Sequence, residues 1–82
     1  MDKSVLIVDD DKKLRDLLTE YLTPYGFRIS TLPDGTKILK AIRTTRPDII
    51  ILDIMMPKKD GLEVLKEIRM DSTVPVIMLT AR

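Results

Sequence analysis

Four short apolar runs constrain the fold of this chain more than any other feature of its sequence. They lie at residues 4–8, 27–32, 48–52 and 75–80, and each interval between two runs has apolar residues at helical spacing, over about residues 11–22, 35–45 and 61–70. Short runs rich in Val and Ile that alternate with helical patterns are typical of buried parallel strands. The sequence therefore predicts a single α/β domain of order βαβαβαβ within its 82 residues.

The connections between these strands predict the order of the sheet. Right-handed crossovers place the strand at 27–32 on one side of the strand at 4–8, and the strand at 48–52 on its other side. The expected architecture is a doubly wound parallel sheet with strand order 2-1-3-4 and helices on both faces. The chain reverses direction between the first and third strands, and ligands bind at the carboxyl ends of strands at such a point.

Polar residues predict where the helices begin. Asp11 or Asp10 can cap the first helix, Asp34 the second, and Asp60 with Glu63 resembles a capping box for the third. Apolar residues on the first helix recur at a helical spacing that predicts one apolar face. That face comprises Leu14, Leu17, Leu18, Tyr21 and Leu22.

Composition excludes several kinds of chemistry. The chain has no Cys and no His, which rules out disulfides, thiol chemistry and imidazole catalysis, and its net charge is only +1. The apolar runs are far shorter than the roughly 20 residues that span a bilayer. We therefore expect a cytoplasmic segment that itself contacts neither nucleic acid nor membrane.

Acidic residues follow two of the apolar runs, and a hydroxyl ends another. Asp9 and Asp10 come after the first run, Asp53 comes after the third, and Thr80 is the last residue of the fourth, so these side chains should converge at one edge of the sheet. Two carboxylates about 4 Å apart repel by about 4 kcal/mol at an effective dielectric of 20. Either protonation or a bound cation relieves this repulsion, and Mg²⁺ fits such oxygen ligands, with the backbone carbonyl of Met55 as a further one.

A carboxylate beside Mg²⁺ can also act as a nucleophile toward phosphorus and form an acyl phosphate. Thr80 is placed to hydrogen-bond a phosphoryl oxygen. Simpler readings exist for single residues, because Asp before a helix is usually a cap and Thr at a strand end is usually a strand former. Asp53, which follows four consecutive Ile and Leu residues, has little structural reason to be acidic.

Three motifs resemble the receiver domain of bacterial two-component response regulators, which has a flavodoxin-like fold. They are VLIVDD at residues 5–10, ILDIMMP at 51–57 followed by DG at 60–61, and PVIMLTA at 75–81. The resemblance spans all 82 residues. The ending LTAR at 79–82 is most similar to the winged-helix transcription-factor branch of that family, which implies a role in transcription regulation.

The resemblance implies roles for these residues. Asp53 would be the phosphoacceptor, Asp10 a direct Mg²⁺ ligand, Asp9 a ligand largely through water, and Met55 a ligand through its carbonyl. Thr80 would move toward the phosphoryl group and carry the switch. The donor would be a phosphohistidine on a sensor histidine kinase, and the protein would be a phosphoacceptor rather than a turnover enzyme.

Complete receiver domains resemble this chain but continue through a further helix, strand and helix. We therefore expect residues 1–82 to be the N-terminal part of a receiver domain, without the lysine that the fifth strand supplies to the phosphoryl group. The alternative is a half-domain without chemistry that self-associates, through the edge of the strand at 75–80 or by segment exchange. An aspartyl-phosphate phosphatase is disfavoured because Met55 stands where that class has a second acid.

Overall fold

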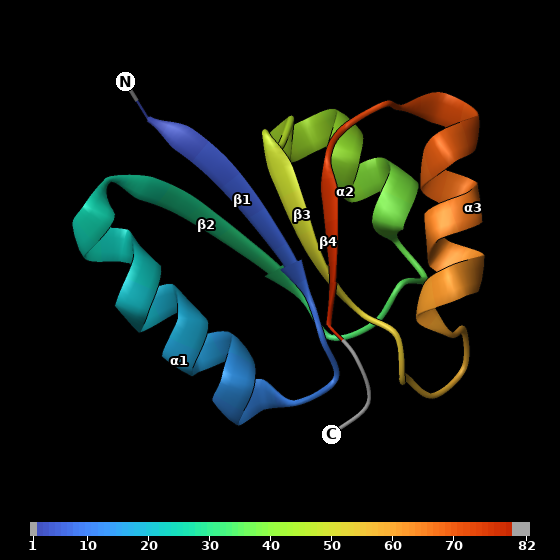
Figure 1. The fold of residues 1–82 in the computed structure, drawn as a ribbon, viewed down its shortest axis with the longest axis horizontal. Coiled ribbons are helices and arrows are strands. Elements are labelled where there is room, and N and C mark those ends of the chain that lie inside the picture. Colours follow the sequence, from blue (N-terminus) through green and yellow to red (C-terminus); the bar gives the residue numbers. More distant parts are fainter. Residues whose placement is uncertain (1, 80–82) are drawn as a thin grey trace.

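The computed structural model describes residues 2–79 and contains a four-stranded parallel sheet of order β2-β1-β3-β4 (Figure 1). Three helices and a short 3-10 turn connect the strands, so the predicted fold class and strand order are confirmed. In chain order the elements are β1 Lys3–Val8, α1 Lys12–Leu22, the 3-10 turn Thr23–Tyr25, β2 Phe27–Leu32, α2 Ile38–Thr45, β3 Ile49–Asp53, α3 Gly61–Asp71 and β4 Val76–Leu79.

The register aligns the carboxyl ends of the strands. Val8 at the end of β1 is paired with Leu32 of β2 and with Leu52 of β3, and Asp53 is paired with Leu79 of β4. The residues that follow β1 and β3 therefore emerge side by side at one edge of the sheet, as the sequence predicts. Thr80 lies outside the described residues, so its expected place at that edge stays a prediction.

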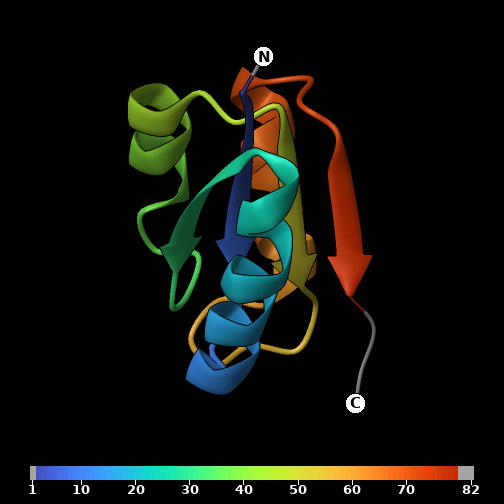
Figure 2. The ribbon, with the colours of Figure 1, turned by 90° about the vertical axis from the view of Figure 1, so that its left-hand side faces the viewer.

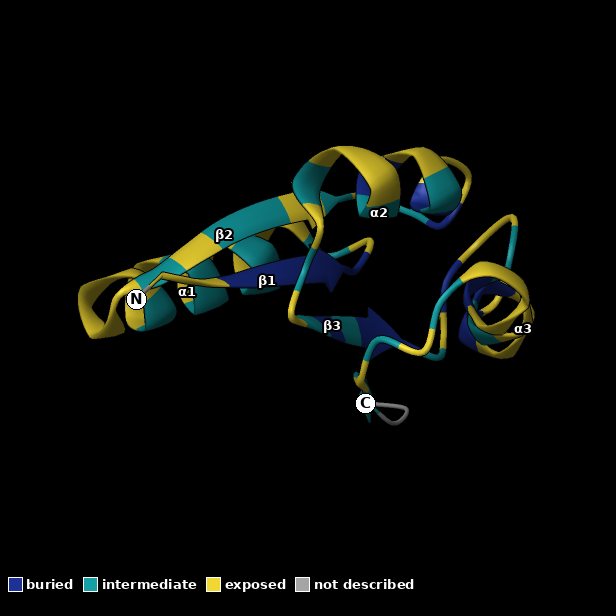
Figure 3. Cartoon of the chain, turned by 90° about the horizontal axis from the view of Figure 1, so that it is seen from above, coloured by how far each residue is buried: buried dark blue, intermediate teal, exposed yellow. Residues whose placement is uncertain are grey.

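The helices divide between the two faces of the sheet. Viewed from above, α2 and α3 lie on one side of the strands and α1 on the other (Figure 3). Side chains that alternate along β1 and β3 face α2 and α3, and they form the main core with residues of these helices. This core comprises Leu6, Val8, Ile38, Ala41, Ile50, Leu52, Met56, Val64 and Ile68.

Helix α1 covers its face of the sheet less completely than its apolar spacing predicts. It contains no fully buried residue, and Leu17 and Tyr21 are 62% and 63% exposed. The helix therefore rests on the sheet through a stripe narrower than its apolar face. The ring of Tyr21 instead lies 5.6 Å from that of Tyr25 in the following 3-10 turn.

Helix α2 begins about one turn later than the sequence suggests. The carboxylate of Asp34 accepts hydrogen bonds from the backbone N–H (2.9 Å) and the hydroxyl (2.7 Å) of Thr36, which closes a local turn before the helix. The helix then starts at Ile38, with Lys37 as its N-cap and no side-chain cap. The prediction that Asp34 caps a helix from residue 35 is wrong, because short Asp side chains stabilise such turns as readily as helix ends.

Helix α3 begins at the cap that the sequence predicts. Oδ1 of Asp60 accepts a hydrogen bond from the backbone N–H of Glu63 at 3.0 Å. Because Asp60 is exposed, Asp60→Ala should lower the free energy of unfolding by about 1 kcal/mol through loss of the cap alone. Chemical denaturation measures this loss, and Asp60→Ser, which keeps an acceptor, should recover most of it. Equal losses in both variants would show that the cap is not the cause.

Among residues 2–79, the structure has no helix that is both long enough and apolar enough to cross a membrane.

Candidate functional site

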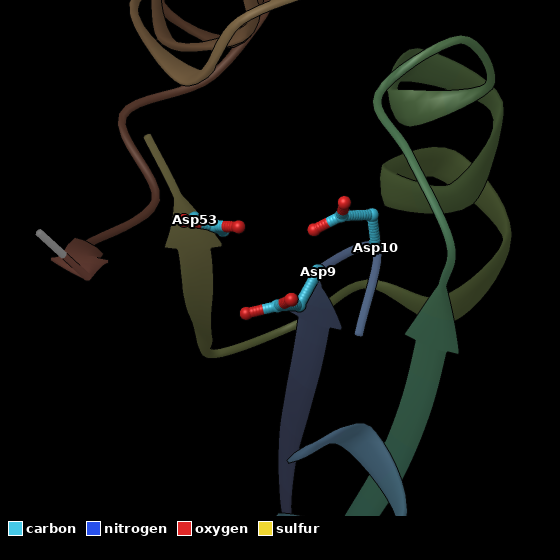
Figure 4. Close-up of side chains that lie close together, drawn as sticks. All are labelled: Asp9, Asp10 and Asp53. Atoms are coloured by element: carbon cyan, nitrogen blue, oxygen red, sulfur yellow. The ribbon is translucent and has the colours of Figure 1, made fainter. Parts of the chain in front are cut away.

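Three carboxylates meet at the carboxyl edge of the sheet. Asp9 and Asp10 follow β1, Asp53 ends β3, and one carboxylate oxygen from each lies within 4.8 Å of the other two. In Figure 4 the three side chains reach into the same space between the ends of β1 and β3. The structure thus brings together the three acids that the sequence analysis singled out, at the switch point of the sheet.

The three acids differ in their exposure to solvent. Asp9 and Asp53 are 0% and 1% exposed, whereas Asp10 is exposed. The buried pair is oriented by nearby backbone amides, since Oδ1 of Asp9 accepts from the N–H of Asp11 at 2.8 Å and Oδ1 of Asp53 accepts from the N–H of Met55 at 3.1 Å. Each of these carboxylates is therefore held in place by the turn that follows its own strand.

Arg15 adds a contact that the sequence analysis missed. Its Nη1 donates a 2.7 Å hydrogen bond to the backbone carbonyl oxygen of Asp9, and the N–H of Asp9 donates to the carbonyl of Leu32 at 3.1 Å. The backbone of Asp9 is thus fixed both by α1 and by the end of β2. The sequence did contain a signal for this contact, because Arg15 is a cationic residue in the first turns of the helix after the acidic pair, six residues from Asp9.

The loop after β3 is held against the site by Gly61. Its N–H donates to the carbonyl of Ile54 at 2.8 Å, and a Cβ atom at this position would lie 2.5 Å from the carbonyl oxygen of Asp53. Only a glycine allows this approach of α3 to the backbone of the site. The side chain of Met55 is 58% exposed on this loop, and the role of its carbonyl as a metal ligand stays a prediction.

Two lysines on the same loop form ion pairs with acids other than the three at the site. Nζ of Lys59 lies 2.6 Å from Glu67, and Nζ of Lys58 lies 3.6 Å from Asp34. Hydrogen bonds from the hydroxyl and the backbone N–H of Thr36, assisted by the charge of Lys58, lower the pKa of Asp34 below its ordinary value. The ammonium groups of both lysines are therefore paired with acids outside the three-carboxylate cluster.

The donor set matches a small hard cation. Mg²⁺ binds oxygen at about 2.0–2.1 Å, so opposite ligands lie about 4.2 Å apart, and it commonly keeps several waters while using only one or two carboxylates. Three carboxylate oxygens within 4.8 Å of one another need little movement to reach such an arrangement. A cation there would also offset the mutual repulsion of the acids.

A parallel 2-1-3-4 sheet with an acidic cluster at its switch point defines a class of α/β modules with flavodoxin-like topology. The family model of the response regulator receiver domain matches residues 5–82. The chain belongs to this family, as the motifs at the ends of its strands predict.

The relatives include DNA-binding regulators. The chain is 44% identical over all 82 residues to the DNA-binding response regulator MtrA of Mycobacterium tuberculosis, and it spans 36% of that protein. It is 49% identical over 79 residues, 96% of its length, to the probable transcriptional regulator ycf27 of Guillardia theta, and it spans 31% of that protein. These relatives agree with the expectation of a transcription-factor branch.

Solved receiver structures share the fold closely. The N-terminal domain of a response regulator receiver protein from Methanoculleus marisnigri superimposes with a TM-score of 0.90 at 39% identity, over 96% of this chain and 67% of that one. Response regulator TrrA from Thermotoga maritima, in complex with Mg²⁺ and BeF, gives a TM-score of 0.87 at 42% identity, over 98% of this chain and 70% of that one.

Proposed function

We propose that this chain is a phosphoacceptor signalling module of a two-component system, and that Asp53 accepts a phosphoryl group from a sensor histidine kinase. One observation carries the proposal: Asp53 is buried at the carboxyl end of a central strand, with the carboxylates of Asp9 and Asp10 beside it. A helix cap or a surface ion pair does not require a buried carboxylate beside two others. Such a cluster is typical of a site that does chemistry.

The proposal gives each residue a part in the transfer. The backbone N–H of Met55 donates to Oδ1 of Asp53 and orients this carboxylate, and a carboxylate oxygen of Asp53 attacks phosphorus. A P–O bond to Asp53 forms as the P–N bond of a phosphohistidine breaks, and the leaving imidazole takes a proton from solvent. Mg²⁺, held directly by Asp10, Asp53 and the carbonyl of Met55, and by Asp9 through water, would neutralise charge on the transferring oxygens.

Thr80 completes the proposed site as a hydroxyl donor toward the phosphoryl group, with a part in the switch. Such a module carries a signal and does not turn over substrate. We further propose that it acts in the cytoplasm, in transcription regulation, and that this segment itself contacts neither membrane nor nucleic acid. Its net charge of +1 supports the last point, because nucleic-acid binding relies on many phosphate contacts.

Acetyl phosphate with Mg²⁺ tests the proposal without knowledge of the kinase. We expect a hydroxylamine-labile phosphoryl adduct that maps to the peptide containing Asp53, and none when Mg²⁺ is replaced by chelator. Asp53→Asn should abolish the adduct, whereas Asp60→Asn, which alters an exposed cap outside the cluster, should leave it unchanged. An adduct on another residue, or one formed equally in Asp53→Asn, contradicts the assignment.

A second candidate is a half-domain that self-associates and does no chemistry. It is favoured by β4, which is an edge strand among residues 2–79 and carries Ile77 at 49% exposure. An edge strand with an exposed apolar side chain is a site for pairing with another chain. This candidate predicts oligomers and no labelling that depends on Mg²⁺.

Sedimentation velocity measures this self-association. We expect the 82-residue chain to form dimers or larger species as concentration rises, by pairing of β4 edges or by exchange of an element between copies. Ile77→Lys should shift the distribution toward monomer, because a charge on an edge strand opposes pairing. Met70→Lys on α3, where Met70 is 85% exposed, is the matched control and should leave the distribution unchanged. A folded monomer at high concentration rules this candidate out.

A further inference from the structure

A groove with a volume of about 230 Å³ lies between α2 and the edge strand β2. Its apolar lining comes from Leu6 of β1, Leu32 of β2 and Ala41 of α2, and Lys37 and Lys40 also line it. None of the three site acids lines the groove, so the proposed phosphoryl transfer makes no use of it.

The groove exists because β2 presents a small side chain beneath α2. Ser30 is paired with Leu6 in the register, so both side chains lie on the face of the sheet that α2 covers. The buried residues of α2, Ile38 and Ala41, belong to the core that β1 and β3 form with α3. These two side chains extend into the core, and the small Ser30 leaves a hollow between α2 and the edge strand.

The charges around the hollow are of one sign. Lys37 and Lys40 are exposed and lie three residues apart, while the lining includes no acidic side chain among the described residues. Four other lysine or arginine side chains, Lys12, Arg43, Lys58 and Lys59, form ion pairs, but no ion pair between described residues involves Lys37 or Lys40. The groove therefore favours an anionic occupant with an apolar part.

Strand β2 adds a means of binding a backbone. It stands at the edge of the sheet opposite β4, and within residues 2–79 β1 is its one strand neighbour (Figure 2). An extended peptide can join such an edge through main-chain hydrogen bonds, with its alternate side chains on the same face as Ser30.

We propose that this groove binds an extended acidic segment of a partner protein. The segment pairs with the free edge of β2, places one apolar side chain in the hollow over Leu6, Leu32 and Ala41, and sets flanking carboxylates against Lys37 and Lys40. Strand pairing supplies the register of the segment, and the two lysines select its charge.

The test uses the synthetic peptide acetyl-Glu-Thr-Leu-Thr-Glu-amide, whose Leu and two Glu side chains share one face when it is extended, and amide chemical shifts of the ¹⁵N-labelled chain. We expect saturable shifts in Ser30–Leu32 and along α2. The double variant Lys37→Glu/Lys40→Glu should weaken binding about tenfold, because two attractive contacts become repulsive. Lys66→Glu, on the exposed surface of α3, is the matched control and should bind as the unaltered chain does.

Two further arms separate strand pairing from simple charge attraction. A peptide of the same sequence with N-methylated alternate amides keeps its charge but cannot pair, and it should lose binding. Ser30→Leu fills the hollow and should also abolish binding while circular dichroism shows an unchanged fold. Asp53→Asn should bind normally, so the outcome is independent of the proposed phosphoryl transfer.

Several results would overturn the inference. These are shifts confined to other surfaces, equal weakening in Lys66→Glu, undiminished binding of the N-methylated peptide, or the same shifts on addition of anionic lipid vesicles without peptide.

Discussion

Gly61→Ala should lower the free energy of unfolding by about 3 kcal/mol or more, a large share of the total for a domain of this size. A Cβ atom at Gly61 would lie 2.5 Å from the carbonyl oxygen of Asp53 and 2.6 Å from Cα of Ile54. Both neighbours are backbone atoms, so no rotamer change relieves the clash. A chain of 82 residues is expected to have only about 4–12 kcal/mol of stability.

Gly35 offers a matched comparison for this effect. A Cβ there would lie 2.2 Å from Cγ2 of Val64, which is a side-chain atom. Gly35→Ala should therefore also destabilise the chain, but Val64→Ala should relieve part of that clash, so the losses in the double variant should sum to less than the two single losses. Gly61→Ala in the Val64→Ala background should show no such recovery.

Urea denaturation of these five variants measures the free energies. The site should respond as well, because Gly61 is in contact with the backbone of Asp53: labelling by acetyl phosphate in the fraction that stays folded should fall in Gly61→Ala. Normal stability of Gly61→Ala would mean that the loop after β3 shifts freely, and the tight approach of α3 would then have no role in holding the site.

The sequence predicts the sheet and the acid cluster because both follow from strand ends. In a parallel sheet, the position of Asp9 or Asp53 is fixed once the strand before it is recognised, and the strands are marked by runs such as residues 49–52. Local turn chemistry is harder to predict. Asp34 could cap a helix or close a turn, and its hydrogen bonds from Thr36 stabilise the turn.

Contacts that depend on how the helices pack left only a weak signal in the sequence. The hydrogen bond from Arg15 to the carbonyl of Asp9 and the approach of Gly61 to Asp53 depend on where α1 and α3 finally pack. The exposure of Leu17 and Tyr21 likewise could not be predicted, since apolar spacing shows which side of a helix could be buried but not how wide a stripe the sheet covers.

Mg²⁺ should raise the thermal stability of the chain, and the charge of Asp10 should account for much of the response. Binding to the folded state alone adds about 2.7 kcal/mol when the ion is present at 100 times its dissociation constant. Asp10→Asn should lose most of this gain, because it removes a carboxylate from a set whose oxygens lie within 4.8 Å of one another.

Without Mg²⁺ the same variant should behave in the opposite way. Asp10 is exposed, so its repulsion with Asp9 and Asp53 is screened by solvent, and we expect Asp10→Asn to gain about 1 kcal/mol in chelator. Asp2→Asn, which removes an exposed acid outside the cluster, is the control and should change neither value. Differential scanning calorimetry in chelator and in Mg²⁺, at matched ionic strength, separates the effects.

The opposite signs of the stability change of Asp10→Asn in chelator and in Mg²⁺ distinguish a metal site from acids that lie close together without binding an ion. If Asp10→Asn is the more stable protein in chelator but the less stable in Mg²⁺, the acids are held together at a cost that the ion offsets, as a site for phosphoryl transfer requires. If Mg²⁺ changes neither protein while Asp10→Asn is still stabilised, the cluster repels without binding. That outcome would remove the metal from the proposed chemistry and favour the half-domain that acts only through its edges.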